Sequence, residues 1–118
     1  MKNRALFYRF GFALAGLRAA WRTENSFKTH IAAAVLVLAV LLWFEPPPLW
    51  WAIAVLTVAF VIGAEVFNTA VEGLADHVHP ERHPAIRTVK DCAAGAVLVA
   101  TIAALGVAAA FVYDVVLR

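Results

Sequence analysis

The fold is decided by the stretch CAAGAVLVATIAALGVAAAFVY at residues 92–113, which contains no charged side chain. A helix of about 20 mostly apolar residues is long enough to cross the hydrocarbon core of a bilayer. The stretch is also rich in alanine and glycine, which allow helices to pack closely inside a membrane. We therefore predict a transmembrane helix over about 91–113.

The whole chain has the composition of a small membrane protein. Of its 118 residues, 64% are hydrophobic and 15% are charged, whereas about 25% charged residues are usual in a soluble domain. The mean hydropathy is +0.80, and a single cysteine cannot form an internal disulfide. This composition excludes a disordered chain, a disulfide scaffold and almost any soluble globule. We expect one integral-membrane domain over 1–118, with no nucleic-acid partner.

Two further apolar runs precede this helix and predict spans over about 29–45 and 49–71. Three prolines at 46–48 separate them and predict a sharp non-helical turn, because proline lacks a backbone donor and restricts the residue before it. Tryptophans flank this turn, as in the aromatic belt of a membrane interface: Trp43, Trp50 and Trp51.

Residues 3–22 mix aromatic side chains with arginines. At 100° per residue, Arg4, Arg18 and Arg22 fall within an arc of about 40°. A separate arc of about 80° holds apolar residues: Leu6, Phe10, Leu14, Leu17 and Trp21. This pattern predicts an amphipathic helix lying in the membrane surface. The alternative is a fourth, imperfect span, which would place three arginines in lipid.

The basic residues predict the orientation of the chain. With three spans, the N-terminal segment and the loop at 76–91 lie on the same side of the membrane. Nine of the ten basic residues belong to that side: Lys2, Arg4, Arg9, Arg18, Arg22, Lys28, Arg82, Arg87 and Lys90. The positive-inside rule therefore places the N terminus and this loop in the cytoplasm.

A polar stripe continues the second span. Glu65, Asn68, Glu72 and Asp76 fall within an arc of about 80° on a helix. An ionisable group at membrane depth costs about 2.5–3.5 kcal/mol on insertion scales, and such residues usually mark functional sites. The alternative is a polar seam between helices. Three acids on one face repel each other unless a cation neutralises them, and this favours a site.

Three further polar residues are expected at the same cytoplasmic level, namely Glu24, Lys90 and Asp91. Carboxylates suit Mg²⁺, which takes one or two of them together with substrate phosphates. Acids for a metal, a lysine for phosphate charge and a spare acid as base are the components of phosphoryl transfer. The sequence has neither a P-loop nor a kinase glycine loop. Any nucleotide would therefore be held by side chains on helices.

A histidine-rich segment is a weaker candidate for a metal site. Histidines 77, 79 and 83 lie near Asp76, but their spacing matches no standard zinc finger and two prolines break the segment. We therefore expect loop histidines here, one of them near a nucleotide, in place of a structural zinc cluster.

Three motifs resemble the bacterial integral-membrane diacylglycerol kinases and their undecaprenol kinase relatives. They are A-G-L-R-A-A-W-x-x-E at 15–24, E-V-F-N-T-A-V-E-G-L-A-D at 65–76 and V-K-D-x-A-A-G-A-V at 89–97. The resemblance covers nearly the whole chain. It implies an all-α homotrimeric bundle of three-span protomers with a surface helix, in the bacterial inner membrane. It also implies active sites between subunits on the cytoplasmic side, where MgATP phosphorylates a lipid alcohol.

The resemblance assigns roles to individual residues. It makes Glu65 the general base for the lipid hydroxyl, Asn68 an amide that orders the site, and Glu24 and Glu72 the metal ligands. Lys90 is implied in both catalysis and nucleotide binding. The other implied nucleotide contacts are Glu24, Glu72, Asp76, Glu81, Arg82, His83 and Asp91. The implied lipid contacts are Arg18, Trp21, Ser26, Phe27, Lys28, Thr29, His30 and Glu65.

The identity of the lipid is less strongly indicated. Residues 16–21 are closer to the diacylglycerol type, whereas 25–30 and 90–96 are closer to the undecaprenol type. Phe12 stands where the diacylglycerol type has a tyrosine, so a hydroxyl contact to nucleotide is expected to be missing. We favour phosphorylation of diacylglycerol to phosphatidic acid, with undecaprenol as the alternative.

Two hypotheses from other classes stay open at this point. A small transporter could use Glu65 as a proton- or cation-coupling carboxylate. This reading explains one buried acid but leaves the other acids and Lys90 without a role. A membrane subunit without chemistry is the third hypothesis.

Overall fold

The computed structural model describes residues 5–118, so the predictions for Lys2, Asn3 and Arg4 lie outside the described residues. The described chain is helical almost throughout, as predicted. Its elements are α1 (Leu6–Thr23), α2 (Asn25–Phe44), α3 (Pro48–Val78), α4 (Pro84–Phe111) and the π-helical turn η1 (Val112–Leu117) that ends α4.

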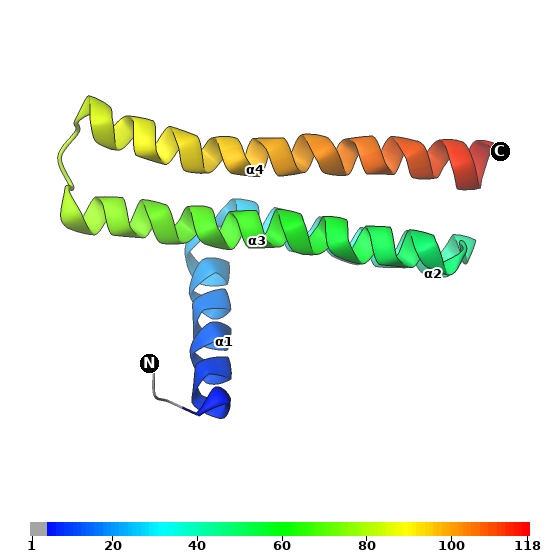
Figure 1. Cartoon of the computed structure of the whole chain (residues 1–118), viewed down its shortest axis with the longest axis horizontal. Helices are drawn as coiled ribbons and strands as arrows, with labels where there is room; N and C mark the ends of the chain where they lie inside the picture. Colours follow the sequence, from blue (N-terminus) through cyan, green and yellow to red (C-terminus); the bar gives the residue numbers. More distant parts are fainter. Residues whose placement is uncertain (1–4) are drawn as a thin grey trace.

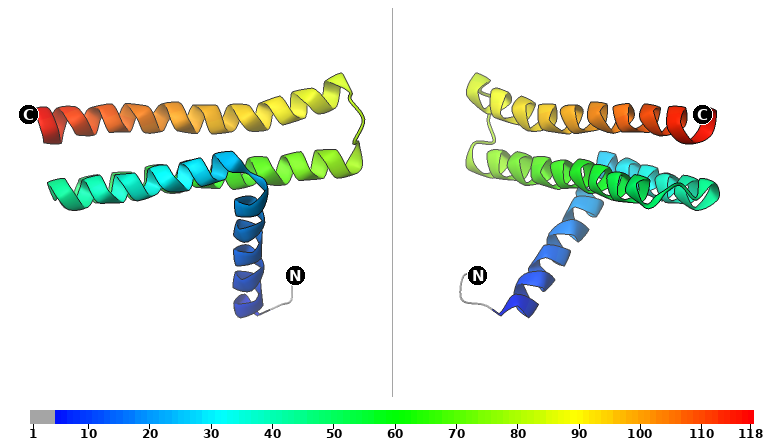
Figure 2. Two further views of the ribbon diagram at one scale, coloured as in Figure 1. Left: turned by 180° about the vertical axis from the view of Figure 1, so that it is seen from behind. Right: turned by 45° about the vertical axis from the view of Figure 1, so that its right-hand side comes forward.

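The helices α2, α3 and α4 run alongside one another, and α1 projects sideways from them (Figures 1 and 2). The start of α2 and the α3–α4 connection lie toward the same end of α3, because consecutive helices run in opposite directions. Within 5–118, α2, α3 and α4 are long and apolar enough to cross a membrane. The prediction of three spanning helices is confirmed at this level, whereas the membrane-surface position of α1 stays a prediction.

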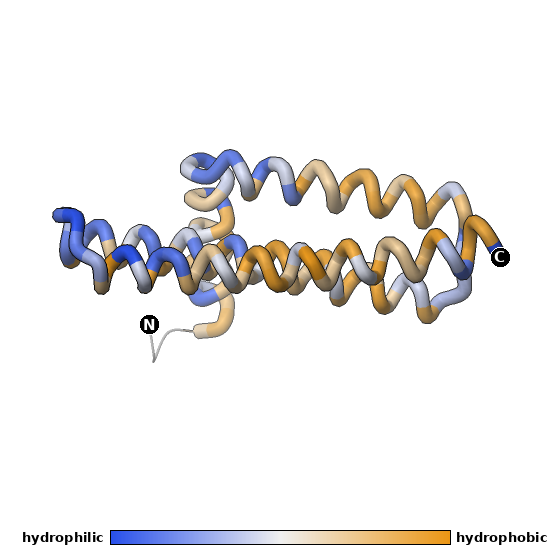
Figure 3. The backbone as a smooth tube through the Cα atoms, turned by 90° about the horizontal axis from the view of Figure 1, so that it is seen from above, coloured by the Kyte–Doolittle hydropathy of each residue, from blue (hydrophilic) through white to orange (hydrophobic). Residues whose placement is uncertain are grey.

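The helix α3 is longer than a membrane requires. It has 31 residues, which at 1.5 Å per residue correspond to roughly 46 Å, compared with about 30 Å of hydrocarbon. It therefore continues beyond the predicted span of 49–71, and α4 begins before the predicted 91. The extra turns of both helices are hydrophilic and meet at the α3–α4 connection (Figure 3). The polar stripe thus lies on the segment where α3 leaves its apolar stretch.

A single residue separates α1 from α2. Glu24 has an extended backbone (φ −121°, ψ 116°) and its N–H donates to the carbonyl of Ala20 at 3.0 Å. Just after this break, Phe27 is buried and its ring meets that of Trp21 edge-on, with centroids 6.5 Å apart. This packed corner places Glu24 at the junction of α1 and α2.

The turn between α2 and α3 is the predicted proline turn. Glu45 adopts the left-handed conformation (φ 46°, ψ 57°), and its N–H donates to the carbonyl of Leu41 at 2.9 Å. Pro48 then begins α3, the position where a fixed φ and a missing N–H cost a helix nothing. The turn therefore ends one helix and starts the next within three residues.

Few side chains are buried inside a single chain. Large apolar residues such as Val55, Leu56 and Phe60 are exposed along the bundle, as expected for surfaces that face lipid or another chain. The buried residues of the described chain are mostly small or apolar: Ala20, Phe27, Leu41, Pro46, Val61, Ala75 and Ala100. Glu65 and Asn68 are the two buried polar residues of 5–118, and both belong to the polar stripe.

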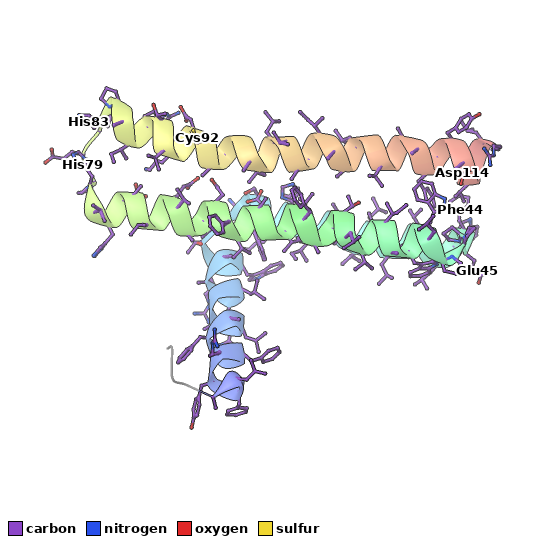
Figure 4. All side chains as sticks on the ribbon, viewed as in Figure 1. Phe44, Glu45, His79, His83, Cys92 and Asp114 are labelled. Carbon is purple, nitrogen blue, oxygen red and sulfur yellow. The ribbon has the colours of Figure 1, made fainter. Side chains whose placement is uncertain are left out.

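The start of α3 contacts the end of α4 at the end of the bundle opposite the polar stripe. The indole N–H of Trp50 donates to Asp114 Oδ2 at 2.9 Å, and Arg118 pairs with Asp114 Oδ1 at 3.2 Å. The ring of Phe111 meets Trp50 edge-on. Asp114 and Phe44 lie at this end, far along the bundle from His79 and His83 (Figure 4).

We expect Trp50→Phe to lower the unfolding midpoint of the detergent-solubilised protein by a few degrees. The variant keeps the aromatic contact and loses the hydrogen bond to Asp114, which contributes about 1 kcal/mol. Thermal unfolding followed by circular dichroism measures the change. Trp43→Phe is the matched control, because Trp43 is 82% exposed. Equal midpoints for the two variants would show that the Trp50–Asp114 bond does not stabilise the fold.

Candidate active site

The centre of the site is the side chain of Glu65, which is 2% exposed. The hydroxyl of Ser26 donates to Glu65 Oε2 at 3.1 Å, and His30 Nδ1 lies 2.9 Å from Glu65 Oε1. Both partners come from the first turns of α2, which pack against the middle of α3. A buried carboxylate without partners is strongly unfavourable. The hydroxyl of Ser26 therefore satisfies one oxygen of this buried carboxylate, and the ring of His30 lies beside the other.

One turn further along α3, Asn68 and Glu72 interact. The amide Nδ2 of Asn68 donates to Glu72 Oε1 at 3.0 Å, with the i, i+4 spacing that brings helical side chains together. The other amide atom, Asn68 Oδ1, is buried and accepts no hydrogen bond from any residue in 5–118. A buried acceptor without a donor or cation is costly. The site therefore has an unused oxygen ligand beside a carboxylate.

Glu24 belongs to the same group of acids. Its pKa is raised above the usual value by partial burial and then by the negative charges of Glu72 and Glu65. This effect shows that the α1–α2 junction brings Glu24 within electrostatic range of two acids on α3. The three carboxylates come from two distant parts of the sequence. The fold thus concentrates negative charge in a place where a cation would be favourable.

Lys90 and Asp91 occupy a different position in the single chain. Lys90 Nζ pairs with Asp76 Oδ1 and so ties the start of α4 to the end of α3. Asp91 pairs with Arg87 on its own helix at 3.2 Å, and both side chains are exposed. Asp76 is eleven residues beyond Glu65, which is roughly 16 Å along a helix. Asp76 is also one turn beyond Glu72, so the pair that it forms with Lys90 adjoins the end of the acidic group, whereas Asp91 is paired only with Arg87 among the described residues.

The α3–α4 connection holds the predicted nucleotide loop. His79 Nδ1 lies 3.0 Å from the carbonyl of Glu81, and His83 Nδ1 accepts the N–H of Ala85 at 3.1 Å, which caps α4. The rings of His79 and His83 meet edge-on (Figure 4). Glu81 and Arg82 are exposed. Throughout residues 5–118, no three histidine, cysteine or acidic side chains lie close enough to hold a metal ion as a ready-made cluster.

The predicted lipid-contacting residues divide into three groups. Ser26 and His30 contact Glu65, whereas Phe27 is buried at the α1–α2 corner. The ammonium of Lys28 lies 5.6 Å from the ring centroid of Trp21. The remaining two are exposed on the outside of α1 and α2: Arg18 and Thr29.

An apolar cavity of about 410 Å³ lies between α2, α3 and α4. His30 lines it at the end near the acids, whereas Trp50 and Phe111 line it at the opposite end. A second, more open groove of about 820 Å³ runs between α3 and α4, and Asn68 is part of its wall. The two apolar cavities therefore reach the site at two residues, His30 and Asn68.

The sequence predicted the acids of the site but missed how one of them is held. It placed Ser26 and His30 in a lipid groove and gave Glu65 no partner. The available signal was their i, i+4 spacing, which puts both polar side chains on one face of α2. That spacing does not say which residue on α3 they meet, because the register between two helices is set by tertiary packing.

These features define a class of protein: a small helical membrane protein with a buried acidic site at one end of three spanning helices. The chain matches the family model described as prokaryotic diacylglycerol kinase over residues 11–112. It is 30% identical over 95 residues to a diacylglycerol kinase of Escherichia coli (strain K12), covering 80% of this chain and 78% of that relative.

Two other relatives extend the comparison. A diacylglycerol kinase of Synechocystis is 36% identical over 101 residues, covering 85% of this chain and 58% of that relative. An undecaprenol kinase of Bacillus subtilis is 37% identical over 93 residues, covering 79% and 76% of the two chains. The chain belongs to the prokaryotic diacylglycerol kinase family. The prediction of a lipid kinase is thereby confirmed.

Proposed function

We propose that this protein transfers the γ-phosphate of MgATP to the hydroxyl of diacylglycerol and so forms phosphatidic acid. The observation that carries the proposal is the convergence of Glu24, Glu65 and Glu72 beside a buried asparagine, in a chain of this family. Undecaprenol is the second candidate substrate, because an undecaprenol kinase is among the similar proteins.

In this proposal Glu65 is the general base. Its carboxylate takes the proton of the lipid hydroxyl, and the lipid oxygen forms a bond to the γ-phosphorus of ATP. The bond from that phosphorus to the β–γ bridging oxygen breaks, and ADP leaves with the electron pair. A carboxylate that is buried and held by two partners suits this role, because it is already oriented before the substrate arrives.

The residues around Glu65 fit a magnesium ion brought in with ATP. Mg²⁺ usually takes one or two protein carboxylates together with phosphate oxygens and water. Glu24 and Glu72 would supply those carboxylates. The pKa of Glu24 is raised first by burial and then by the charges of Glu72 and Glu65, and a bound cation would offset that second contribution. The unpaired Asn68 Oδ1 adds an oxygen beside them. When bound, the ion supplies neutralisation of the charge that develops on the phosphates.

We further propose that the working enzyme is a homotrimer whose sites combine residues of neighbouring subunits. Within one chain, Lys90 pairs with Asp76 and Asp91 pairs with Arg87, and neither forms an ion pair with the three glutamates among the described residues. A neighbouring copy could bring its own Lys90 and Asp91, with the loop at 81–83, to these acids. The exposed apolar side chains of α3 supply surface for such contacts. In this arrangement Asp76 orients Lys90 toward the nucleotide.

The proposed location is the bacterial inner membrane, with the hydrophilic end of the bundle in the cytoplasm. Among the described residues, every lysine and arginine except Arg118 lies on α1, at the start of α2 or at the α3–α4 end, and the positive-inside rule places these in the cytoplasm. This orientation gives ATP access to the acids from the cytoplasm and gives the lipid access from the bilayer.

We expect Lys90→Gln to raise the KM for ATP about tenfold or more, because a charged contact to phosphate contributes about 1.5–3 kcal/mol. Steady-state kinetics at saturating lipid measure the effect. Arg118→Gln is the matched control, since it removes a positive charge from the far end of the same helix. An unchanged KM for ATP in Lys90→Gln would exclude Lys90 as a nucleotide contact.

The choice of lipid is tested directly by competition. Purified protein is reconstituted in vesicles that hold diacylglycerol and undecaprenol at equal mole fractions, and the labelled products are separated. We expect phosphatidic acid to form faster than undecaprenyl phosphate. The reverse ratio would make the protein an undecaprenol kinase. Label in neither lipid, together with cation flux across the vesicle membrane, would favour a transporter.

A further inference from the structure

We propose that His30 and Ser26 are positioning residues, which hold the carboxylate of Glu65 in one orientation for proton transfer. This assignment rests on the proposed function. It differs from the role implied by the family resemblance, in which both residues line the groove for the lipid. The difference is physical: a groove residue contributes to lipid binding, whereas a positioning residue contributes to the chemical step.

The geometry gives each oxygen of Glu65 its own partner. Ser26 Oγ is 3.1 Å from Oε2, and His30 Nδ1 is 2.9 Å from Oε1. The contact at His30 is a close approach and not an aligned hydrogen bond, because His30 Nδ1 is buried and has no hydrogen-bond partner among residues 5–118. A proton on that nitrogen would have Glu65 Oε1, 2.9 Å away, as its acceptor. Two contacts on different oxygens prevent rotation of the carboxylate about its last bond. One contact alone would leave that rotation free.

The same arrangement leaves room for the substrate. An ionised carboxylate offers about four acceptor positions on its two oxygens. Ser26 donates to Oε2 and His30 lies beside Oε1, so each oxygen has one neighbour on α2 and keeps a position for the lipid hydroxyl. The side chain of Glu65 is buried, whereas that of His30 is 21% exposed. The contacts with Glu65 thus come from α2, and in this proposal the lipid hydroxyl approaches the carboxylate from the side away from α2.

The charged neighbours make the two contacts more important. Glu65 and Glu72 lie within electrostatic range of Glu24, whose pKa is raised first by burial and then by their negative charges. Repulsion from two acids would turn the Glu65 carboxylate away from them if nothing held it. Misplacement of a reacting group by about 1 Å can lower a rate about 100-fold. The α2 donors therefore resist a displacement that the acids of the site would otherwise cause.

The test separates positioning from lipid binding. In vesicles with saturating MgATP, we expect His30→Leu to lower kcat by about 10- to 100-fold with the KM for diacylglycerol within about twofold of wild type. His30→Asn keeps an N–H at the place of Nδ1 and is expected to recover most of the kcat. Ser26→Ala should lower kcat less, and Ser26→Thr should restore it. Thr101→Val is the control, because that hydroxyl bonds only its own helix, at Val97.

Two outcomes would overturn the proposal. A raised lipid KM with unchanged kcat in His30→Leu would return His30 to the lipid groove. Equal kcat values for His30→Asn and His30→Leu would show that the N–H has no role. Infrared spectra of the carboxylate of Glu65, identified by subtraction of Glu65→Gln, add a readout that needs no activity. A Glu65 carboxylate band that has the same frequency in wild type and in His30→Leu also contradicts the proposal. Wild-type protein that phosphorylates no lipid would instead refute the proposed function, and the infrared result would still stand.

Discussion

Glu65→Gln is expected to lower the kcat for lipid phosphorylation by about 10²- to 10⁴-fold, the usual contribution of a general base. Glutamine has the shape of glutamate, but its amide cannot accept the proton of the lipid hydroxyl. One end of the amide also presents N–H groups to a donor on α2, Ser26 or His30. We therefore expect lost turnover in a folded protein. Initial rates with labelled ATP and the circular dichroism spectrum measure the two properties.

The matched control is Glu45→Gln, which removes a carboxylate in the proline turn at the opposite end of the bundle. We expect its kcat to stay within about twofold of wild type, because the turn is a span's length away from Glu65. Turnover near the wild-type level in Glu65→Gln would exclude Glu65 as the base.

The second large effect concerns magnesium. We expect Glu72→Gln and Glu24→Gln each to raise the Mg²⁺ concentration for half-maximal activity by about 10- to 100-fold, since even indirect supports of a metal site contribute this much to affinity. Both variants remove one of the carboxylates that the ion would contact. Activity is titrated with Mg²⁺ at a fixed concentration of ATP, so that the shift reports the protein's own contribution.

The thermal unfolding of the protein without Mg²⁺ tests the same acids in a second way. Loss of a carboxylate from Glu24 relieves repulsion from Glu65 and Glu72, so Glu24→Gln should unfold at a higher temperature than wild type when Mg²⁺ is absent. Glu45→Gln again serves as the control for loss of a distant acid. Superimposable Mg²⁺ titrations of Glu72→Gln and wild type would remove Glu72 from the metal site.

Much of the fold could be predicted from the sequence because membrane spans are determined locally. The charge-free stretch at 92–113 and the prolines at 46–48 specify a helix and a turn without reference to the rest of the chain. The continuation of α3 through the polar stripe was also predicted, whereas the start of α4 at Pro84 was not. The polar ends of α3 and α4 continue past the apolar runs, since backbone hydrogen bonding does not stop where hydropathy does.

The candidate site also has a part that could be predicted from local sequence and a part that depends on tertiary packing. The grouping of Glu65, Asn68 and Glu72 follows from helical spacing alone, and the position of Glu24 follows from the break between α1 and α2. The contacts of Glu65 with α2 could not be predicted, because they depend on how two helices pack. The pairing of Lys90 with Asp76 is equally a product of packing, and it joins two residues that the sequence had placed at the same level.

Charged side chains are rare in this chain because its three long apolar helices suit the lipid of a membrane. The few charged residues that it keeps therefore indicate where its chemistry takes place. Glu65 and Asn68 are the buried polar residues among 5–118, and both lie in the group that includes Glu24 and Glu72. In a soluble protein of the same length, polar residues would cover the surface and obscure such a group. Here the buried carboxylate is kept despite its desolvation cost, which is the pattern of a functional site.

The most direct test of lipid phosphorylation follows the fate of each phosphate of ATP. Purified protein in vesicles with diacylglycerol receives ATP labelled at either the γ- or the α-phosphate, with Mg²⁺ present or chelated. We predict labelled phosphatidic acid from γ-labelled ATP only, and only with Mg²⁺. Unlabelled lipid under all these conditions, or lipid labelled from the α-phosphate, would contradict a kinase reaction at the Glu65 site.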